Sequence, residues 1–123
     1  MKEIIHKELS YEVMGAVFKV HSYLGPGLLE SAYESCLVIE LRRRGLKVSQ
    51  QHVFPIYYYG EAAAAYIADL VVEGTIILEL KSVQILTSTM EAQLINYLRL
   101  SKLRVGYLIN LFGKRVVYKR FVL

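Results

Sequence analysis

Residues 67–83 read IADLVVEGTIILELKSV, two apolar runs that carry three side chains of unexpected charge. The runs are rich in β-branched residues and are separated by Glu73-Gly74, which is typical of a hairpin of two buried strands. Asp69, Glu79 and Lys81 are unusual there, because a buried charge is costly unless it is paired or binds a metal. The stretch therefore predicts either solvated strand ends or a set of groups assembled for chemistry.

The turn decides whether these charged residues share one face of the sheet. A two-residue loop at Glu73-Gly74 pairs Asp69 with Leu78, and Glu79 and Lys81 then point away from Asp69. A three-residue loop that ends at a left-handed Gly74 instead pairs Asp69 with Ile77 and places all three charges on one face. Glycine suits the third position of that loop, so we expect the second register. The other face then holds only hydrocarbon side chains, from Leu70, Ile76, Leu78 and Leu80.

Two helical patterns precede the hairpin. Apolar residues at helical spacing predict a first helix that is capped by Ser10 and stops near residues 25–27. His21 lies at the end of that helix, where we expect its ring near a terminal carbonyl. A second helix is expected over residues 28–44. Its last turn holds three arginines, whose charge suits the carboxyl end of a helix better than it indicates a nucleic-acid patch.

Strand patterns and one further helix complete the chain. Residues 47–59 are rich in β-formers, and Pro55 implies an edge strand or a bulge. A helix is expected over residues 90–104, and two last strands follow it on either side of Gly113-Lys114. The order α-α-β-β-β-α-β-β predicts an α/β domain (α+β, mixed sheet) built on one sheet. The candidates for the cap of the third helix are Thr87, Ser88 and Thr89.

The composition indicates a globular cytoplasmic protein. The chain has 123 residues, of which 54% are hydrophobic and two are proline, so we expect one ordered domain over residues 1–123. No apolar run reaches the roughly 18 residues that cross a bilayer, and residues 1–10 mix charges too evenly for a signal peptide. Cys36 is the only cysteine, and we expect a buried structural thiol.

Asp69, Glu79 and Lys81 form a recognisable chemical set when they share a face. The two carboxylates can hold Mg²⁺ or Mn²⁺ through oxygen ligands, and the backbone carbonyl of Leu80 can join them. Lys81 can orient or help deprotonate a water that attacks a phosphodiester. The alternative is an ion pair at the rim of the sheet, in which Lys81 neutralises Glu79.

Several motifs resemble one protein family. GLLESAY at residues 27–33 fits the signature of the GxxExxY protein family, and HSYLGPG, ADLVVEG, LELKSV, AQLINYL and VGYLIN follow the family's order. That family is grouped with the PD-(D/E)XK nuclease superfamily. The resemblance implies a restriction-endonuclease-like α-β-β-β-α-β core, and the expected order contains this core with an extra N-terminal helix and an extra C-terminal strand.

The resemblance also implies roles for individual residues. Asp69, Glu79 and Lys81 match the superfamily's catalytic motif, and Gln93 matches a polar position that supports the site. Glu30 matches an acidic residue that often supplies an additional metal ligand. Two tyrosines are expected to support these groups, Tyr33 one turn beyond Glu30 and Tyr97 on the same helical face as Gln93.

The leading hypothesis is a Mg²⁺- or Mn²⁺-dependent nuclease that cleaves DNA or RNA. A second hypothesis is a non-catalytic binding or assembly module, in which the strand with Tyr57-Tyr58-Tyr59 is an exposed edge that forms a homodimer. A third is simple nucleic-acid binding, to which the net charge of +4 gives weak support. Its basic residues would be Lys114, Arg115, Lys119 and Arg120.

Overall fold

The helices and strands follow the order expected from the sequence. The structure is a computed structural model that describes residues 5–123, so residues 1–4 of the expected domain lie outside the described part. The elements are α1 (Lys7–Leu24), α2 (Glu30–Arg43), β1 (Val48–Tyr58), β2 (Glu61–Val72), β3 (Ile76–Lys81), α3 (Ser88–Ser101), β4 (Val105–Asn110) and β5 (Val117–Val122). Within residues 5–123, no helix combines the length and apolar character that crossing a bilayer requires.

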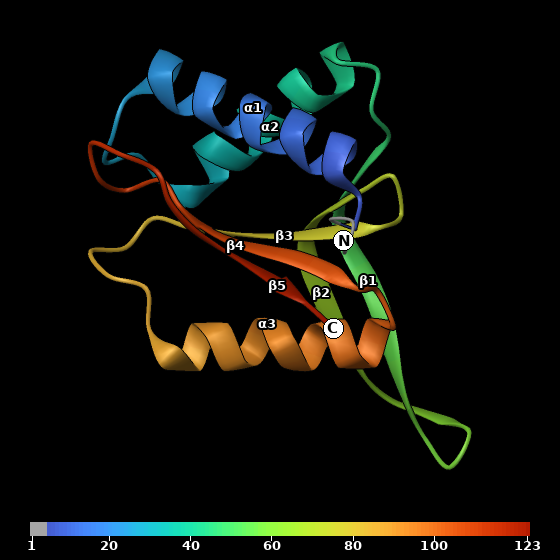
Figure 1. The fold of residues 1–123 in the computed structure, drawn as a ribbon. Coiled ribbons are helices and arrows are strands. Elements are labelled where there is room, and N and C mark those ends of the chain that lie inside the picture. The colour runs from blue at the N-terminus through green and yellow to red at the C-terminus, as the bar shows by residue number, and fades with distance from the viewer. Residues whose placement is uncertain (1–4) are drawn as a thin grey trace, which may run out of the picture.

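All five strands form one mixed sheet in the order β1-β2-β3-β4-β5. Only β3 and β4 pair in parallel, and the other neighbours are antiparallel. A parallel pair needs a crossover connection, which α3 provides. The sheet lies between α1 and α2 on one face and α3 on the other (Figure 1).

Each face of the sheet has its own hydrophobic core. The alternation of side chains sends Leu70, Leu78 and Leu80 towards α1 and α2, and Ile77 and Leu108 towards α3. On the second face, α3 packs closely on β4 at Gly106. A Cβ atom there would lie 3.0 to 3.3 Å from Leu94 and Leu98, so the glycine allows this approach.

The β2–β3 turn preserves the expected shared face but in a register shifted by two residues. Val72 pairs with Ile76, so the three-residue loop is Glu73-Gly74-Thr75 and begins one residue later than expected. Glu73 and Gly74 both have left-handed backbones, with φ of 53° and 63°. Lys47 fixes this turn, because its backbone accepts from the Glu73 N–H and donates to the Glu73 carboxylate. Side chains alternate between the two faces of a strand, so a register shift of two residues leaves the charged positions on the same face.

The start of α1 differs from the expectation. Ser10 lies inside the helix, and its buried Oγ has no partner in the described structure, while the residue before the helix is His6. The prediction that Ser10 caps this helix was wrong. The helix begins earlier because Ile5 and Leu9 also pack against the core. By contrast, Thr87 does cap α3, accepting from the Met90 N–H at 3.2 Å.

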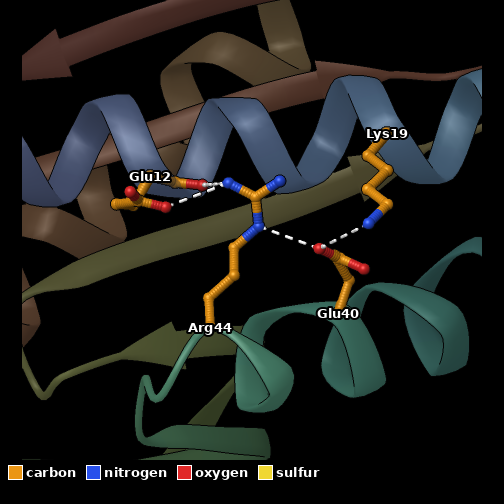
Figure 2. Close-up of polar contacts among 4 residues, drawn as sticks. All are labelled: Glu12, Lys19, Glu40 and Arg44. Carbon is orange, nitrogen blue, oxygen red and sulfur yellow. Dashed lines mark hydrogen bonds and ion pairs between the residues drawn. The ribbon is translucent and has the colours of Figure 1, made fainter.

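Ion pairs fix α2 against α1. The Arg44 guanidinium lies 2.9 Å from the carboxylates of Glu12 on α1 and Glu40 on α2, and Lys19 lies 3.7 Å from Glu40 (Figure 2). The hydrogen bond from Arg44 holds the pKa of Glu40 below its ordinary value. Arg42 donates to the carbonyl of Val48. Two of the three arginines at this helix end therefore have structural partners.

Candidate active site

Strands β2 and β3 separate at the level of Asp69 and Glu79. Their pairing runs from Val72↔Ile76 to Leu70↔Leu78, which places Asp69 across from Glu79. The Asp69 carboxylate accepts a hydrogen bond from the backbone N–H of Leu80 at 2.8 Å. The side chain of Asp69 thus satisfies a strand N–H at the point where the backbones part. The result is two carboxylates side by side on the α3 face of the sheet.

A chain of aromatic contacts covers Glu79. The residue is 8% exposed, and the Tyr66 hydroxyl donates a hydrogen bond to its carboxyl group. The Tyr66 ring lies between the rings of Phe54 and Tyr97, with 11° and 14° between the planes. The stack brings α3 into the site through Tyr97, and it excludes water from Glu79.

Burial and a neighbouring negative charge change the acidity of Glu79. Desolvation, followed by the charge of Asp69, raises the pKa of Glu79 to about 8. The hydrogen bond from Tyr66 and the positive charge of Lys81 act in the opposite direction. Desolvation and the charge of Glu79 also raise the pKa of Tyr66 and of Tyr97, so both hydroxyls remain protonated donors. Near neutral pH, the acid pair therefore retains a proton.

The acid pair fits a hard divalent cation. Two adjacent carboxylates with little solvent carry a repulsion that a cation would relieve. Mg²⁺ is often bound by one or two carboxylates and keeps several waters, so this pair is a sufficient donor set. Over residues 5–123, no three His, Cys, Asp or Glu side chains gather in a metal-binding group. The carbonyl of Leu80 as a further ligand stays a prediction.

Glu30 does not join the acid pair. It is the first residue of α2 and is exposed. Tyr33 does not contact its carboxylate: the buried hydroxyl donates to the Gly25 carbonyl at 2.7 Å and accepts from the Leu28 N–H at 3.1 Å. Ser82, directly after β3, donates to the Leu28 carbonyl. The start of α2 thus lies next to the end of β3, and a role for Glu30 as a metal ligand stays a prediction.

Lys81 and Gln93 are coupled to the acid pair from two different elements, β3 and α3. Lys81 ends β3, is half-buried, and its charge lowers the pKa of Glu79. Gln93 is exposed on α3, and its hydrogen bond to Tyr97 opposes the rise in the pKa of that tyrosine. Gln93 is therefore linked to Glu79 indirectly: it bonds Tyr97, whose ring stacks on Tyr66, and Tyr66 bonds Glu79. The structure brings together five groups of the site, from Asp69, Glu79, Lys81, Tyr97 and Gln93.

Two further residues of this region, Tyr66 and Asn110, do not follow from the sequence patterns. Tyr66 is three positions before Asp69, and a regular strand would place the two on opposite faces. The sequence feature that marks Tyr66 is its position as a single aromatic residue directly after four alanines. Asn110 is 6% exposed at the end of β4, where its side chain bonds the N–H and carbonyl of Val83 and the N–H of Phe112. It fixes the chain just beyond Lys81.

His21 has a different partner from the one expected. Its Nε2 lies 2.9 Å from the carbonyl of Gly113, in the turn between β4 and β5, and its ring stacks on Tyr33. The Gly27 N–H donates to the carbonyl of Phe112 in the same turn. His21 therefore joins the end of α1 to the β4–β5 turn, and the expectation of a helix-terminal carbonyl was wrong.

Comparisons with known proteins give a family and a fold. A family model described as the PD-(D/E)XK nuclease superfamily matches residues 7–121. The crystal structure of SSO0001 is similar, with a TM-score of 0.57 and 17% identity; the match covers 95% of this chain and 59% of that one. This chain thus spans less than two thirds of that protein. No curated protein matches.

These matches, with the five-stranded mixed sheet, confirm the expected α/β, restriction-endonuclease-like fold. The family model names the superfamily, and membership of the GxxExxY family stays a prediction.

Glu79→Gln is expected to stabilise the metal-free protein at alkaline pH. The native pKa is about 8 against an ordinary 4.5, so between these values the native state holds a proton that the unfolded chain has released. The free energy of unfolding of the wild type therefore falls as pH rises through this window. The neutral amide removes that loss, which gives a gain on the order of 2 to 4 kcal/mol at about pH 9.

Urea unfolding in EDTA at about pH 5 and pH 9 measures this difference. The control is Glu61→Gln, which alters an exposed carboxylate at the start of β2. The same pH dependence in the wild type and Glu79→Gln would contradict a protonated Glu79.

Proposed function

Because the chain belongs to the PD-(D/E)XK nuclease superfamily, we propose that it is a Mg²⁺- or Mn²⁺-dependent nuclease that hydrolyses phosphodiester bonds of DNA or RNA. The observation that supports this most strongly is the adjacent pair of Asp69 and Glu79, with Lys81 two residues further along the same strand face. A cytoplasmic location belongs to the same proposal.

The residues of the site have different roles in this proposal. Asp69 and Glu79 would hold the cation, the Leu80 carbonyl would join them, and Glu30, which lies apart from the pair in the metal-free protein, would be a further ligand from the start of α2. When bound, the ion supplies Lewis-acid chemistry, by which it activates water and neutralises charge on the phosphate. Lys81 adds a positive charge where the transition state gains negative charge.

Tyr66 and Tyr97 have positioning roles in this proposal. The Tyr66 hydroxyl is a donor that keeps one Glu79 oxygen in a fixed direction, and the stacked Tyr97 ring prevents it from turning away. Gln93 supports Tyr97 in turn. Since Glu79 must release its proton before it binds a cation, ion binding strengthens as pH rises towards about 8.

Basic residues near the end of the sheet support a nucleic-acid substrate. The Leu111 N–H donates to the Lys81 carbonyl at 3.0 Å, so the β4–β5 turn starts beside the site. Lys114 and Arg115 are exposed in that turn. Phosphate groups are recognised through such cations. By contrast, Lys119 pairs with Glu91 and Arg120 bonds Tyr107, so these two have intramolecular roles.

Asp69→Asn and Lys81→Met are each expected to lower Mg²⁺-dependent cleavage by about 100-fold or more, because each removes a charge from the reacting centre. The measurement uses purified protein, fluorescently labelled DNA and RNA, and parallel reactions in EDTA. Glu61→Gln is the matched control, since it removes a carboxylate at the far end of β2 from Asp69. Equal residual cleavage in the wild type and both variants would point to a contaminating nuclease and reject the assignment.

A second candidate, a non-catalytic assembly module, is favoured by the arm formed by β1 and β2. Residues 53–67 pair only within the arm, from Val53↔Ile67 to Tyr58↔Glu61, and project beyond β3 (Figure 1). Tyr57, Tyr58 and Tyr59 are 64%, 68% and 89% exposed. Residues 48–60 contain no Lys, Arg, Asp or Glu, so nothing in this edge repels a second copy of the chain.

In this second candidate the arm pairs two copies into a homodimer. Sedimentation equilibrium is then expected to show a concentration-dependent dimer, which Tyr57→Lys weakens by about tenfold or more because it places charge in the apolar edge. Tyr23→Lys, which alters a tyrosine on α1 that is 90% exposed, serves as the control. A monomer at every concentration would reject the homodimer.

A further inference from the structure

Gln51 lies across the sheet from Asp69 and has an unusual backbone. The β1–β2 pairing includes Gln50↔Leu70 and His52↔Ala68, which places Gln51 opposite Asp69. Its φ is 50°, in the left-handed region that a residue with a Cβ rarely adopts. The register is the same on either side of Gln51, so this is a local distortion of the strand without an inserted residue, and such a distortion can redirect nearby side chains.

The neighbouring strand changes face at the same level. Tyr66 and Val71 both pack on the α3 side although they are five residues apart, whereas Leu70 packs on the side of α1 and α2. A regular strand would place residues five apart on opposite faces. The irregularity between Tyr66 and Val71 is what allows the Tyr66 hydroxyl and the Asp69 carboxylate to meet at Glu79.

Glu34 on α2 holds this irregularity from the other face. Its carboxylate accepts from the side-chain amide of Gln51 with both oxygens, at 3.0 and 3.1 Å, and from that of Gln50 at 2.7 Å. Hydrogen bonds to an ionised carboxylate are stronger than neutral ones. Three such contacts on two consecutive residues bind the unusual segment of β1 to a helix that is itself fixed to α1 by Arg44.

We propose that Glu34 and Gln51 form a positioning clamp for Asp69. The clamp maintains the left-handed backbone at Gln51, and this backbone sets the path of β2 that directs Asp69 to the Leu80 N–H and towards the cation. The part that concerns the cation rests on the proposed function. Glu34 does not touch the cation or the substrate, and its effect reaches the site only through the backbone.

Glycine provides the decisive comparison, because it adopts a positive φ without support. Gln51→Ala removes the clamp and keeps the Cβ, so it is expected to speed hydrogen exchange of the Leu80 amide about tenfold or more in metal-free protein. Gln51→Gly also removes the clamp but tolerates the backbone, and should stay within about threefold of the wild type. Glu34→Ala should match Gln51→Ala, and the double variant Glu34→Ala/Gln51→Gly should recover.

NMR-detected exchange in EDTA measures these rates, with the Leu78 amide of the same strand as the internal reference. Equal rates for Gln51→Ala and Gln51→Gly, or no recovery in the double variant, would overturn the clamp. A faster exchange of the Leu78 amide in Glu34→Ala would indicate that this variant loosens the whole strand. The comparison of Gln51→Ala with Gln51→Gly then tests the clamp by itself.

Calorimetric titration with Mn²⁺ separates the clamp from the nuclease proposal. The Kd is expected to rise about tenfold in Gln51→Ala and to stay near the wild-type value in Gln51→Gly. If the wild type binds no Mn²⁺, the proposed function fails, while the exchange rates of Leu80 still decide the clamp.

Discussion

The close approach of the Asp69 and Glu79 carboxylates is the constraint on which the rest of the site depends. A buried carboxyl group is tolerated when it is neutral or when a cation compensates it, and the neighbouring Asp69 makes ionisation of Glu79 harder still. Local contacts surround the two buried carboxyl groups. Leu80 donates its N–H to Asp69, Tyr66 donates its hydroxyl to Glu79, and the stacked Tyr97 keeps water out. Burial and the charge of Asp69 keep Glu79 protonated near neutral pH, while the donors from Tyr66 and Leu80 fix the directions of the two carboxyl groups.

The sheet topology explains why these groups meet. Because β3 and β4 are parallel, their carboxyl ends lie at one end of the sheet, where Lys81 pairs with Asn110. The crossover helix α3 covers the face of the sheet that holds the acid pair and contributes Tyr97. The turn before α2 is tied to β3 through Ser82 and to the β4–β5 turn through Gly27, and His21 at the end of α1 bonds the same β4–β5 turn. Segments distant in sequence are thus joined around the acid pair by hydrogen bonds to backbone carbonyls, which hold the site without placing further charges in it.

The sequence alone predicts much of the fold because local patterns encode it. Periodicity identifies the helices and strands in their order, and the parity of the β2–β3 register places Asp69, Glu79 and Lys81 on one face. The loop itself lies one residue later, since the left-handed Glu73 depends on Lys47, which is distant in sequence. Tyr66 could not be found from alternation, because the strand changes face between Tyr66 and Val71. Ser10, His21 and Asn110 likewise take roles set by tertiary packing: one lies buried inside a helix, and the other two bond loops that periodicity does not describe.

The most direct test of this account is an NMR titration of the Glu79 side-chain carboxyl carbon, recorded in a chelator and again with saturating Mg²⁺. The expected midpoint is about pH 8 in the metal-free protein, because burial and Asp69 disfavour the charged form. With Mg²⁺ the midpoint should move down by about one pH unit or more, since the ion and the proton compete for the same carboxylate. A midpoint near the ordinary value of 4.5 that does not respond to Mg²⁺ would contradict it.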